Sequence, residues 1–388
     1  MHFEIEAARD PRDLMRGLRF ASLTECSLSL HRSETNQLQY TAMVHGLSRS
    51  VLAVLALLAT GCADRGKPAV QPEPLPQPAP LSYAANEVDG GGRALGKAVI
   101  VTIDGVRWQE IFTGTDLGRT TEPPLDARSL TPNLHRLGER AGAFVGAPGR
   151  GTISASGPNY VSLPGYIEIL GGRPARCQDN KCARTALPSL LDEARVAGAK
   201  VAAYSSWERI DLAASVAPGA FEMSCGRHND PAIDPWPGEG DYRPDRFTSE
   251  AAIAYYAKER PDVFFLGLGD PDEHAHRGDY AGYVNALRRA DETVGRLLEL
   301  VDRRTTVIVT ADHGRALTFD HHGGMAEAGR VWLVAAGPHF NARGAVLSPH
   351  PRRLADIAPT LRVVMGLPPD ITEKSGAPID ELFEPQPL

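Results

Sequence analysis

The chain has 388 residues, of which 42% are hydrophobic and 23% are charged, a balance typical of a globular protein with a large core. A formal net charge of -7 and an aromatic content of only 6% argue against a protein that binds nucleic acid, which needs a basic surface and stacking platforms. The five cysteines have no C-x-x-C spacing, so a structural zinc ribbon is not expected.

The first feature along the chain is an export signal. A basic segment after Met43 is followed by an apolar run from Val51 to Leu58, by small residues, and by Cys62. The run is too short to span a bilayer, and the pattern resembles the signal peptide of a bacterial lipoprotein, in which the cysteine after the cleavage site is lipidated. We therefore expect an exported protein of the bacterial cell envelope, anchored to a membrane through Cys62. The alternative is a buried core helix that ends in Gly-Cys.

This signal divides the chain into four parts. Residues 1–42 precede the signal, and we interpret them as an upstream segment from a start codon assigned too early; residues 43–62 are the signal itself. Residues 63–95 are rich in proline and glycine, which is typical of an extended tether rather than a domain. Residues 96–388 are expected to form one catalytic domain.

Within that domain, short β-branched runs alternate with amphipathic helical patterns. This alternation predicts an α/β fold with a mostly parallel central sheet and helices on both faces. The predicted strands are Lys97–Ile103, Lys200–Tyr204, Val263–Leu268, Thr305–Thr310 and Val331–Ala335, and the predicted helices are Pro132–Ala141, Leu187–Ala197, Arg246–Lys258 and Asp279–Val301.

Three of the predicted strands are followed by acidic residues. Asp104 follows the first strand, Asp270 and Asp272 follow Val263–Leu268, and Asp312 follows Thr305–Thr310. Carboxyl ends of parallel strands meet at one edge of a sheet, where ligands bind. Carboxylates gathered there without a partner would repel one another and lose hydration, so a bound cation is expected.

Histidines complete this pattern. His276 lies four residues after Asp272, His313 follows Asp312, and His322 precedes two glycines. Aspartate and histidine are ligands that zinc takes in catalytic sites. Each of these residues alone has an ordinary alternative as a helix cap or a surface side chain, but the ordered set predicts a metal site.

Ser162 is the candidate nucleophile. It stands in Gly157–Gly172, a stretch that looks like a loop turning into a helix, with Pro164 in the first turn. We expect Ser162 at the N-cap, where free backbone N–H groups and the helix dipole would favour a phosphate. The alternative is that Ser162 is only a helix cap.

These motifs together resemble the alkaline phosphatase superfamily, and in particular its type I phosphodiesterase (nucleotide pyrophosphatase) and sulfatase-like branches. The similarity covers about residues 97–366 and includes the tail from Asp356 to Leu361, which is similar to the closing helix of the family. Each motif is short, and the order of the set carries the resemblance.

The resemblance implies two zinc ions, although other divalent metals would also suit. One would be held by Asp272, His276 and His322; the other would be held by Asp104, Asp312 and His313. Ser162 would attack a small phosphate ester between them and form a phosphoserine intermediate. The remaining acidic and histidine residues of the region would surround the ligands without binding metal, although His321 could exchange roles with His322: Asp270, Glu273, His274, Asp320 and His321.

The chain departs from some family patterns. Tyr166 stands where a sulfatase has arginine, which argues against a sulfatase, and no match to the monoester-binding arginine of alkaline phosphatase is visible. Candidate substrate-binding residues are Asn159, whose spacing from Ser162 differs from the phosphodiesterase pattern, and Arg107 and Trp108, which follow Asp104.

Cys177 and Cys182 close a short loop in a chain that we expect to be exported, so a disulfide between them is predicted. Cys225 could instead pair with either.

Two other functions remain open at this point. The first is a phosphomutase or phosphonate hydrolase of the same superfamily, and the second is an envelope lipoprotein that binds without catalysis.

Overall fold

The structure is a computed structural model that describes residues 95–226, 241–319, 322–372 and 374–384. The predicted upstream segment, the signal peptide with Cys62 and almost all of the predicted tether lie outside the described residues, as do Asp320 and His321. Within the described ranges, no helix combines the length and the apolar character needed to cross a membrane.

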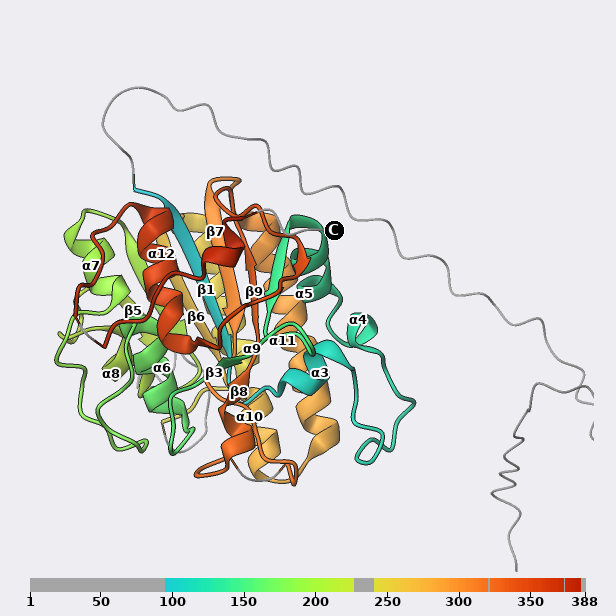
Figure 1. The fold of residues 1–388 in the computed structure, drawn as a ribbon. Coiled ribbons are helices and arrows are strands. Elements are labelled where there is room, and N and C mark those ends of the chain that lie inside the picture. The colour runs from blue at the N-terminus through green and yellow to red at the C-terminus, as the bar shows by residue number, and fades with distance from the viewer. Residues whose placement is uncertain (1–94, 227–240, 320–321, 373, 385–388) are drawn as a thin grey trace, which may run out of the picture. The chain divides into compact units, whose positions relative to one another are not determined.

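An eight-stranded sheet lies at the centre of the described body, in the order β10-β2-β9-β7-β1-β6-β4-β5 (Figure 1). Only β9 among these strands runs antiparallel to its neighbours, so the predicted α/β fold with a mostly parallel sheet is confirmed. Every residue of β6 and β7 is buried, as expected for central strands covered on both faces. The strands of this sheet are β1 (Lys97–Ile103), β2 (Gly142–Val145), β4 (Val201–Ser205), β5 (Glu222–Cys225), β6 (Val263–Leu268), β7 (Thr305–Thr310), β9 (Leu333–Ala336) and β10 (Gly344–Ala345).

Helices cover both faces of the sheet. One group packs around α6 and α12, and the other packs around α11, which lies behind the sheet in Figure 1. The first group is α6 (Ser162–Gly171), α7 (Leu190–Val196), α8 (Ile210–Ala214) and α12 (Ile357–Met365). The second includes α5 (Pro132–Arg136), α9 (Asp245–Glu259), α10 (Asp270–His276) and α11 (Tyr280–Leu300).

The predicted helix Pro132–Ala141 is present in two parts, α5 and a π-helical turn that continues it, η1 (Leu137–Ala141). The other predicted helices differ from the observed ones by one to three residues at their ends, which is the usual uncertainty of helix boundaries. The remaining short helices and turns are α3 (Trp108–Phe112), α4 (Ala127–Leu130), η2 (Ala326–Gly329), η3 (Leu354–Asp356) and η4 (Asp380–Leu382).

The predicted strand Val331–Ala335 is wrong in one respect, because the chain changes sheets in the middle of it. Its start, β8 (Arg330–Val331), joins a three-stranded sheet with β3 (Ile153–Ser154) and β11 (Arg352–Arg353), whereas β9 belongs to the central sheet. Trp332 lies at the change: its indole N–H donates to the Val106 carbonyl at 3.0 Å, and its own carbonyl accepts the Thr310 hydroxyl at 2.6 Å. These long-range bonds turn the strand, and no local pattern encodes them.

Candidate metal centre and nucleophile

The site lies beyond the carboxyl ends of β1, β6 and β7, three neighbouring parallel strands. Their registers are aligned, since Ile103 pairs with Leu268 and Thr102 pairs with Thr310. Asp104 therefore emerges beside the start of α10, which carries Asp272, and beside the loop that carries Asp312. The sheet edge gathers the carboxylates as the sequence predicted.

Two clusters of candidate metal ligands form there, with the memberships that the resemblance implied. Asp272, His276 and His322 form one, and Asp104, Asp312 and His313 form the other. In each cluster the ligand atoms lie within 4.8 Å of one another. The rings of His313 and His322 stack with centroids 4.3 Å apart, which places the two clusters side by side.

Two glycines allow this close assembly. Gly105 has a φ of +65°, and a Cβ there would collide with the carboxylate of Asp272. A Cβ at Gly165 would lie 2.5 Å from the Asp312 carbonyl oxygen. Any larger residue would push the turn after β1, or the first turn of α6, away from the opposite ligands.

The cluster of Asp104, Asp312 and His313 is almost completely buried. The His313 Nδ1–H donates to the Gly314 carbonyl at 2.8 Å, so Nε2 faces Asp104 Oδ1 at 3.4 Å and Asp312 Oδ2 at 3.5 Å. Burial by itself would lower the pKa of His313, but the surrounding carboxylates, Asp312 first among them, raise it to about 10. Burial and the charge of Asp104 hold the pKa of Asp312 well above its usual value.

The second cluster is more accessible. His276 Nε2 lies 2.9 Å from Asp272 Oδ2, and the other oxygen of Asp272 accepts a bond from Arg315. His322 Nδ1 donates to the Tyr160 carbonyl at 3.1 Å, which leaves its Nε2 facing His276 Nε2 at 3.4 Å. Burial and the neighbouring charge of His313 lower the pKa of His322 to about 3, so its imidazole is neutral at pH 7.

Three features of these clusters fit bound dications. The Asp312 Oδ2 atom is buried and has no hydrogen-bond partner, which is costly unless a cation neutralises it. Backbone carbonyls hold the Nδ1 protons of His313 and His322, so Nε2 is the atom that each ring can offer to a metal once that atom is deprotonated. Each cluster offers three oxygen and nitrogen ligands, the number that leaves a catalytic zinc an open position.

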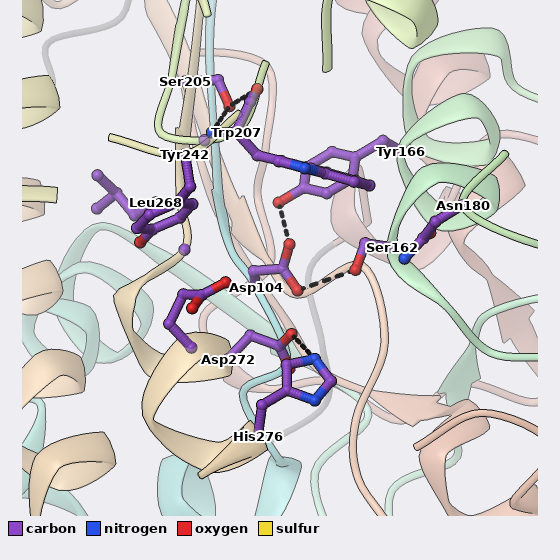
Figure 2. A pocket seen from close by; sticks show the side chains of 13 residues that line it. Asp104, Ser162, Tyr166, Asn180, Ser205, Trp207, Tyr242, Leu268, Asp272 and His276 are labelled. Atoms are coloured by element: carbon purple, nitrogen blue, oxygen red, sulfur yellow. Dashed lines mark hydrogen bonds and ion pairs between the residues drawn. The ribbon is translucent and has the colours of Figure 1, made fainter. Parts of the chain in front are cut away.

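Ser162 lies against the buried cluster. Its Oγ is 3.4 Å from Asp104 Oδ1 (Figure 2). The same atom is 3.2 Å from His313 Nε2. The expected N-cap role is wrong by one position: Val161 is the N-cap and Ser162 is the first helical residue. The acceptor in the first turn is instead Asn180, whose Oδ1 takes the Leu163 N–H at 2.9 Å. Because Asn180 supplies this acceptor, the Ser162 hydroxyl remains directed at the ligands.

Tyr166 supports the same ligand from α6. It lies one helical turn after Ser162, and its hydroxyl donates to Asp104 Oδ2 at 3.0 Å (Figure 2). Burial and the charges of Asp104 and Asp312 raise the pKa of Tyr166 well above its usual value, so the hydroxyl keeps its proton. The four-residue spacing from Ser162 is a helical pattern that could have indicated this role from the sequence.

A cavity of about 140 Å³ opens in front of Ser162. Part of its lining comes from Trp207, just after β4, and from Tyr242, just before α9. The sequence did not predict a role for either residue. The lining residues are Asp104, Ser162, Tyr166, Asn180, Ser205, Trp207, Tyr242, Gly267, Leu268, Gly269, Asp272, Glu273 and His276 (Figure 2).

None of the three predicted substrate-binding residues is among these lining residues. Arg107 is buried, and its guanidinium pairs with Glu110 and Asp116 instead of facing the cavity. Trp108 stacks under the Arg330 guanidinium at 3.9 Å, and the exposed Asn159 donates its amide to the Gln178 carbonyl at 2.9 Å. The buried Glu110, in the first turn of α3, explains why Arg107 turns inward.

Of the acidic and histidine residues predicted to surround the metal ligands, one lines the cavity and others bond to neighbouring segments. Glu273 lines the cavity, whereas Asp270 accepts bonds from the Tyr242 hydroxyl at 2.6 Å and the Asp245 N–H at 3.1 Å. His274 pairs with Asp279 at 2.8 Å, near the start of α11.

The predicted Cys177–Cys182 disulfide is present, and Cys225 is free.

Comparison with known proteins agrees with this geometry. Residues 245–369 match the family model of the metalloenzyme superfamily. Over this segment the chain carries the predicted resemblance to the alkaline phosphatase-like metalloenzyme superfamily. The matched segment contains the cluster of Asp272, His276 and His322 but does not reach Asp104 and Ser162, which the tertiary structure brings to the same site.

The curated relatives that match include 2,3-bisphosphoglycerate-independent phosphoglycerate mutases. The chain is 33% identical to the mutase of Desulforudis audaxviator over 35% of this chain and 27% of the mutase. It is 31% identical to that of a Synechococcus strain over 33% of this chain and 26% of the mutase. The chain thus spans about a quarter of the length of these relatives.

Solved structures share the fold across most of the described body. The phosphonate monoester hydrolase of Agrobacterium radiobacter aligns with a TM-score of 0.53 at 14% identity, covering 75% of this chain and 78% of that one. A 2-O GAG sulfatase aligns with a TM-score of 0.52 at 14% identity, covering 75% of each chain. At this identity the similarity establishes the fold alone.

Proposed function

We propose that this protein hydrolyses phosphate esters at a two-zinc site, with Ser162 as the nucleophile and diesters preferred over monoesters. The observation that carries the proposal is the position of the Ser162 hydroxyl. It touches two ligand atoms of the buried cluster and faces the cavity that Asp272 and His276 of the second cluster also line.

The chain's own residues prepare Ser162 for attack. Asp104 and His313 orient its hydroxyl, and Tyr166 holds Asp104 in place from the opposite side. When bound, two dications supply Lewis acidity that favours the serine alkoxide and stabilises charge on the leaving oxygen. Ser162 Oγ forms a bond to phosphorus as the bond to the leaving alcohol breaks, and water then hydrolyses the phosphoserine.

Asn180 supplies a hydrogen-bond donor for the substrate. Its Oδ1 accepts the Leu163 N–H, and this bond fixes which atom of the amide is the oxygen and which is the nitrogen. Figure 2 shows the nitrogen, Nδ2, turned toward Ser162. A donor beside the nucleophile suits a non-bridging phosphate oxygen, whose charge develops during the reaction.

The charge of the cavity favours a diester. Among the described residues that line it there is no lysine or arginine, and Glu273 adds a carboxylate beside Asp272. A monoester dianion brings one more negative charge than a diester and finds no cationic side chain on these walls. The sequence similarity to phosphoglycerate mutases supports phosphoryl transfer as the reaction class.

The test is the Ser162→Ala variant, assayed with bis-nitrophenyl phosphate and with nitrophenyl phosphate. We expect kcat to fall by at least about 10³-fold with zinc content unchanged, because nucleophile and ligands are different residues. Ser156→Ala is the matched control, since its hydroxyl bonds Glu168 and does not line the cavity. Full activity in Ser162→Ala would refute the assigned nucleophile.

The similarity to mutases gives a second candidate, the transfer of phosphate between two positions of one substrate. The two reactions differ in their product. Hydrolysis of a diester releases an alcohol and a monoester, whereas a mutase converts one monoester into an isomer without net release.

We also propose that the protein is exported and anchored to the cell envelope through a lipid on Cys62. The Cys177–Cys182 disulfide supports an oxidising compartment. Incorporation of labelled fatty acid into the wild type and its loss in Cys62→Ser would test the anchor. A wild-type chain that takes up no label would contradict it.

A further inference from the structure

The loop between α6 and α7 brings a functional side chain to the cavity without any regular structure of its own. Residues 172–189 contain no helix or strand, yet Asn180 lies on the cavity wall (Figure 2). A loop of this length without secondary structure is unusual in a compact domain and is often functional. Something other than a backbone ladder must therefore hold Asn180 in place.

The strongest restraint on this loop is the disulfide that closes around Asn180. Cys177 and Cys182 flank it on both sides, with their Cα atoms 5.7 Å apart. Cys182 is buried in the hydrophobic core, and Cys177 packs against the same core. The covalent ring thus ties both ends of the segment to the body of the protein.

Apart from the Leu163 N–H bond to Asn180 itself, the hydrogen bonds from elsewhere in the fold to this segment come from side chains near the surface. The exposed Asn159 donates to the Gln178 carbonyl at 2.9 Å, and the partly exposed Arg209 donates to the Asn180 carbonyl at 3.2 Å. Single hydrogen bonds of this kind contribute little net stability, because water competes for both partners.

We propose that the Cys177–Cys182 disulfide is a positioning device for the reaction. It holds Asn180 so that Oδ1 keeps the Leu163 N–H and Nδ2 stays directed at the phosphate next to Ser162. Cys177 and Cys182 act through Asn180 and do not touch the substrate. This inference rests on the proposed function, and it makes full activity dependent on an oxidised loop.

The experiment is a double-mutant cycle on the full chain loaded with zinc. The Cys177→Ser/Cys182→Ser variant is compared with the wild type, and the same pair is compared in an Asn180→Ala background. We expect removal of the disulfide to lower kcat/KM by about 10-fold when Asn180 is present, and by less than about 2-fold when it is absent, because only positioned donors stabilise the transition state. Cys225→Ser is the matched control, since Cys225 is a free thiol on β5.

A second readout does not depend on turnover. Calorimetric titration with inorganic phosphate should show about 10-fold weaker binding after loss of the disulfide, with no such change in the Asn180→Ala background, while bound zinc stays constant. If the double serine variant does not fold, the wild type is reduced with tris(2-carboxyethyl)phosphine. This reagent takes an oxygen from water as the disulfide gains two electrons and two protons to become two thiols.

The outcomes separate the two proposals. Equal losses with and without Asn180, or no loss in the wild-type background, would overturn the positioning role. A wild-type chain that binds zinc and phosphate but turns over no ester would overturn the proposed function, and the phosphate titrations would still decide the role of the disulfide.

Discussion

Replacing Asp312 by asparagine should stabilise the metal-free protein and should reduce the stability that bound zinc adds. The substitution keeps the shape of a fully buried side chain and removes its charge. The ligand oxygens of Asp312 and Asp104 lie within 4.8 Å, so in the state with both carboxylates ionised their charges repel by roughly 3 kcal/mol at an effective dielectric constant of about 20.

The imidazolium of His313 offsets part of this repulsion but cannot pair fully with both carboxylates. Its Nε2 is 3.4 Å from Asp104 Oδ1 and 3.5 Å from Asp312 Oδ2. The Asp312→Asn variant would leave one carboxylate beside one imidazolium. We therefore expect the metal-free variant to gain about 1–2 kcal/mol in its free energy of unfolding, a part of the Coulomb term.

Bound zinc offsets or reverses this gain. A neutral amide is a weaker ligand than a carboxylate, and a ligand that binds the native state stabilises it in proportion to the logarithm of its affinity. A loss of about 10–100-fold in affinity removes about 1.4–2.7 kcal/mol of zinc-dependent stability at saturating zinc.

Urea unfolding in chelator and in excess zinc measures both effects. Asp291→Asn is the control, because Asp291 is a buried carboxylate that accepts bonds from Asn133 N, Asn133 Nδ2 and Leu134 N. Its replacement should destabilise the protein by about 1–3 kcal/mol with or without zinc. If Asp312→Asn destabilises the metal-free protein, then the charge of Asp312 is already compensated there and the carboxylate does not need a bound cation.

Three further predictions concern protonation, folding and selectivity. His313 has a pKa raised from 6.5 to about 10, so in the metal-free protein its contribution to stability is complete below pH 6.5 and is lost as the pH rises through 10. Zinc must displace the proton of His313 to bind there. Chelator competition should therefore show the zinc affinity of this cluster rising about tenfold per pH unit between about pH 7 and 9. Arg107→Met should lower the free energy of unfolding by about 3–5 kcal/mol, because the buried Glu110 loses its cationic partner and keeps only the hydroxyls of Tyr280 and Tyr283. The substitution should not change KM in the folded enzyme; a raised KM would return Arg107 to the substrate site. Glu273→Lys should raise the ratio of monoester to diester kcat/KM by about 10-fold, since one charge reversal near a dianion is worth about 1.4 kcal/mol or more, and an unchanged ratio would remove Glu273 from selectivity.

Local order along the chain was enough to predict the parallel strands β1, β6 and β7 of the central sheet and the carboxylates at their ends. Continuous β-branched runs encode buried parallel strands, and acidic residues within a few positions of the end of each run are expected near the same edge of the sheet. Asp104, Asp272 and Asp312 could therefore be assigned to one site, and the nearby histidines could be added as ligands that zinc takes; the division into two sets followed from the family resemblance.

Which side chains face the cavity depends on contacts between distant parts of the packed chain. Asn159 and Asn180 are both asparagines in loops near Ser162, and the choice between them depends on the Leu163 N–H and on how the disulfide loop folds back. Arg107 was expected at the substrate site because it follows Asp104, but the buried Glu110 draws it inward. Contacts of this kind join a residue to partners at other places in the fold, and a linear pattern carries no information about them until the chain has packed.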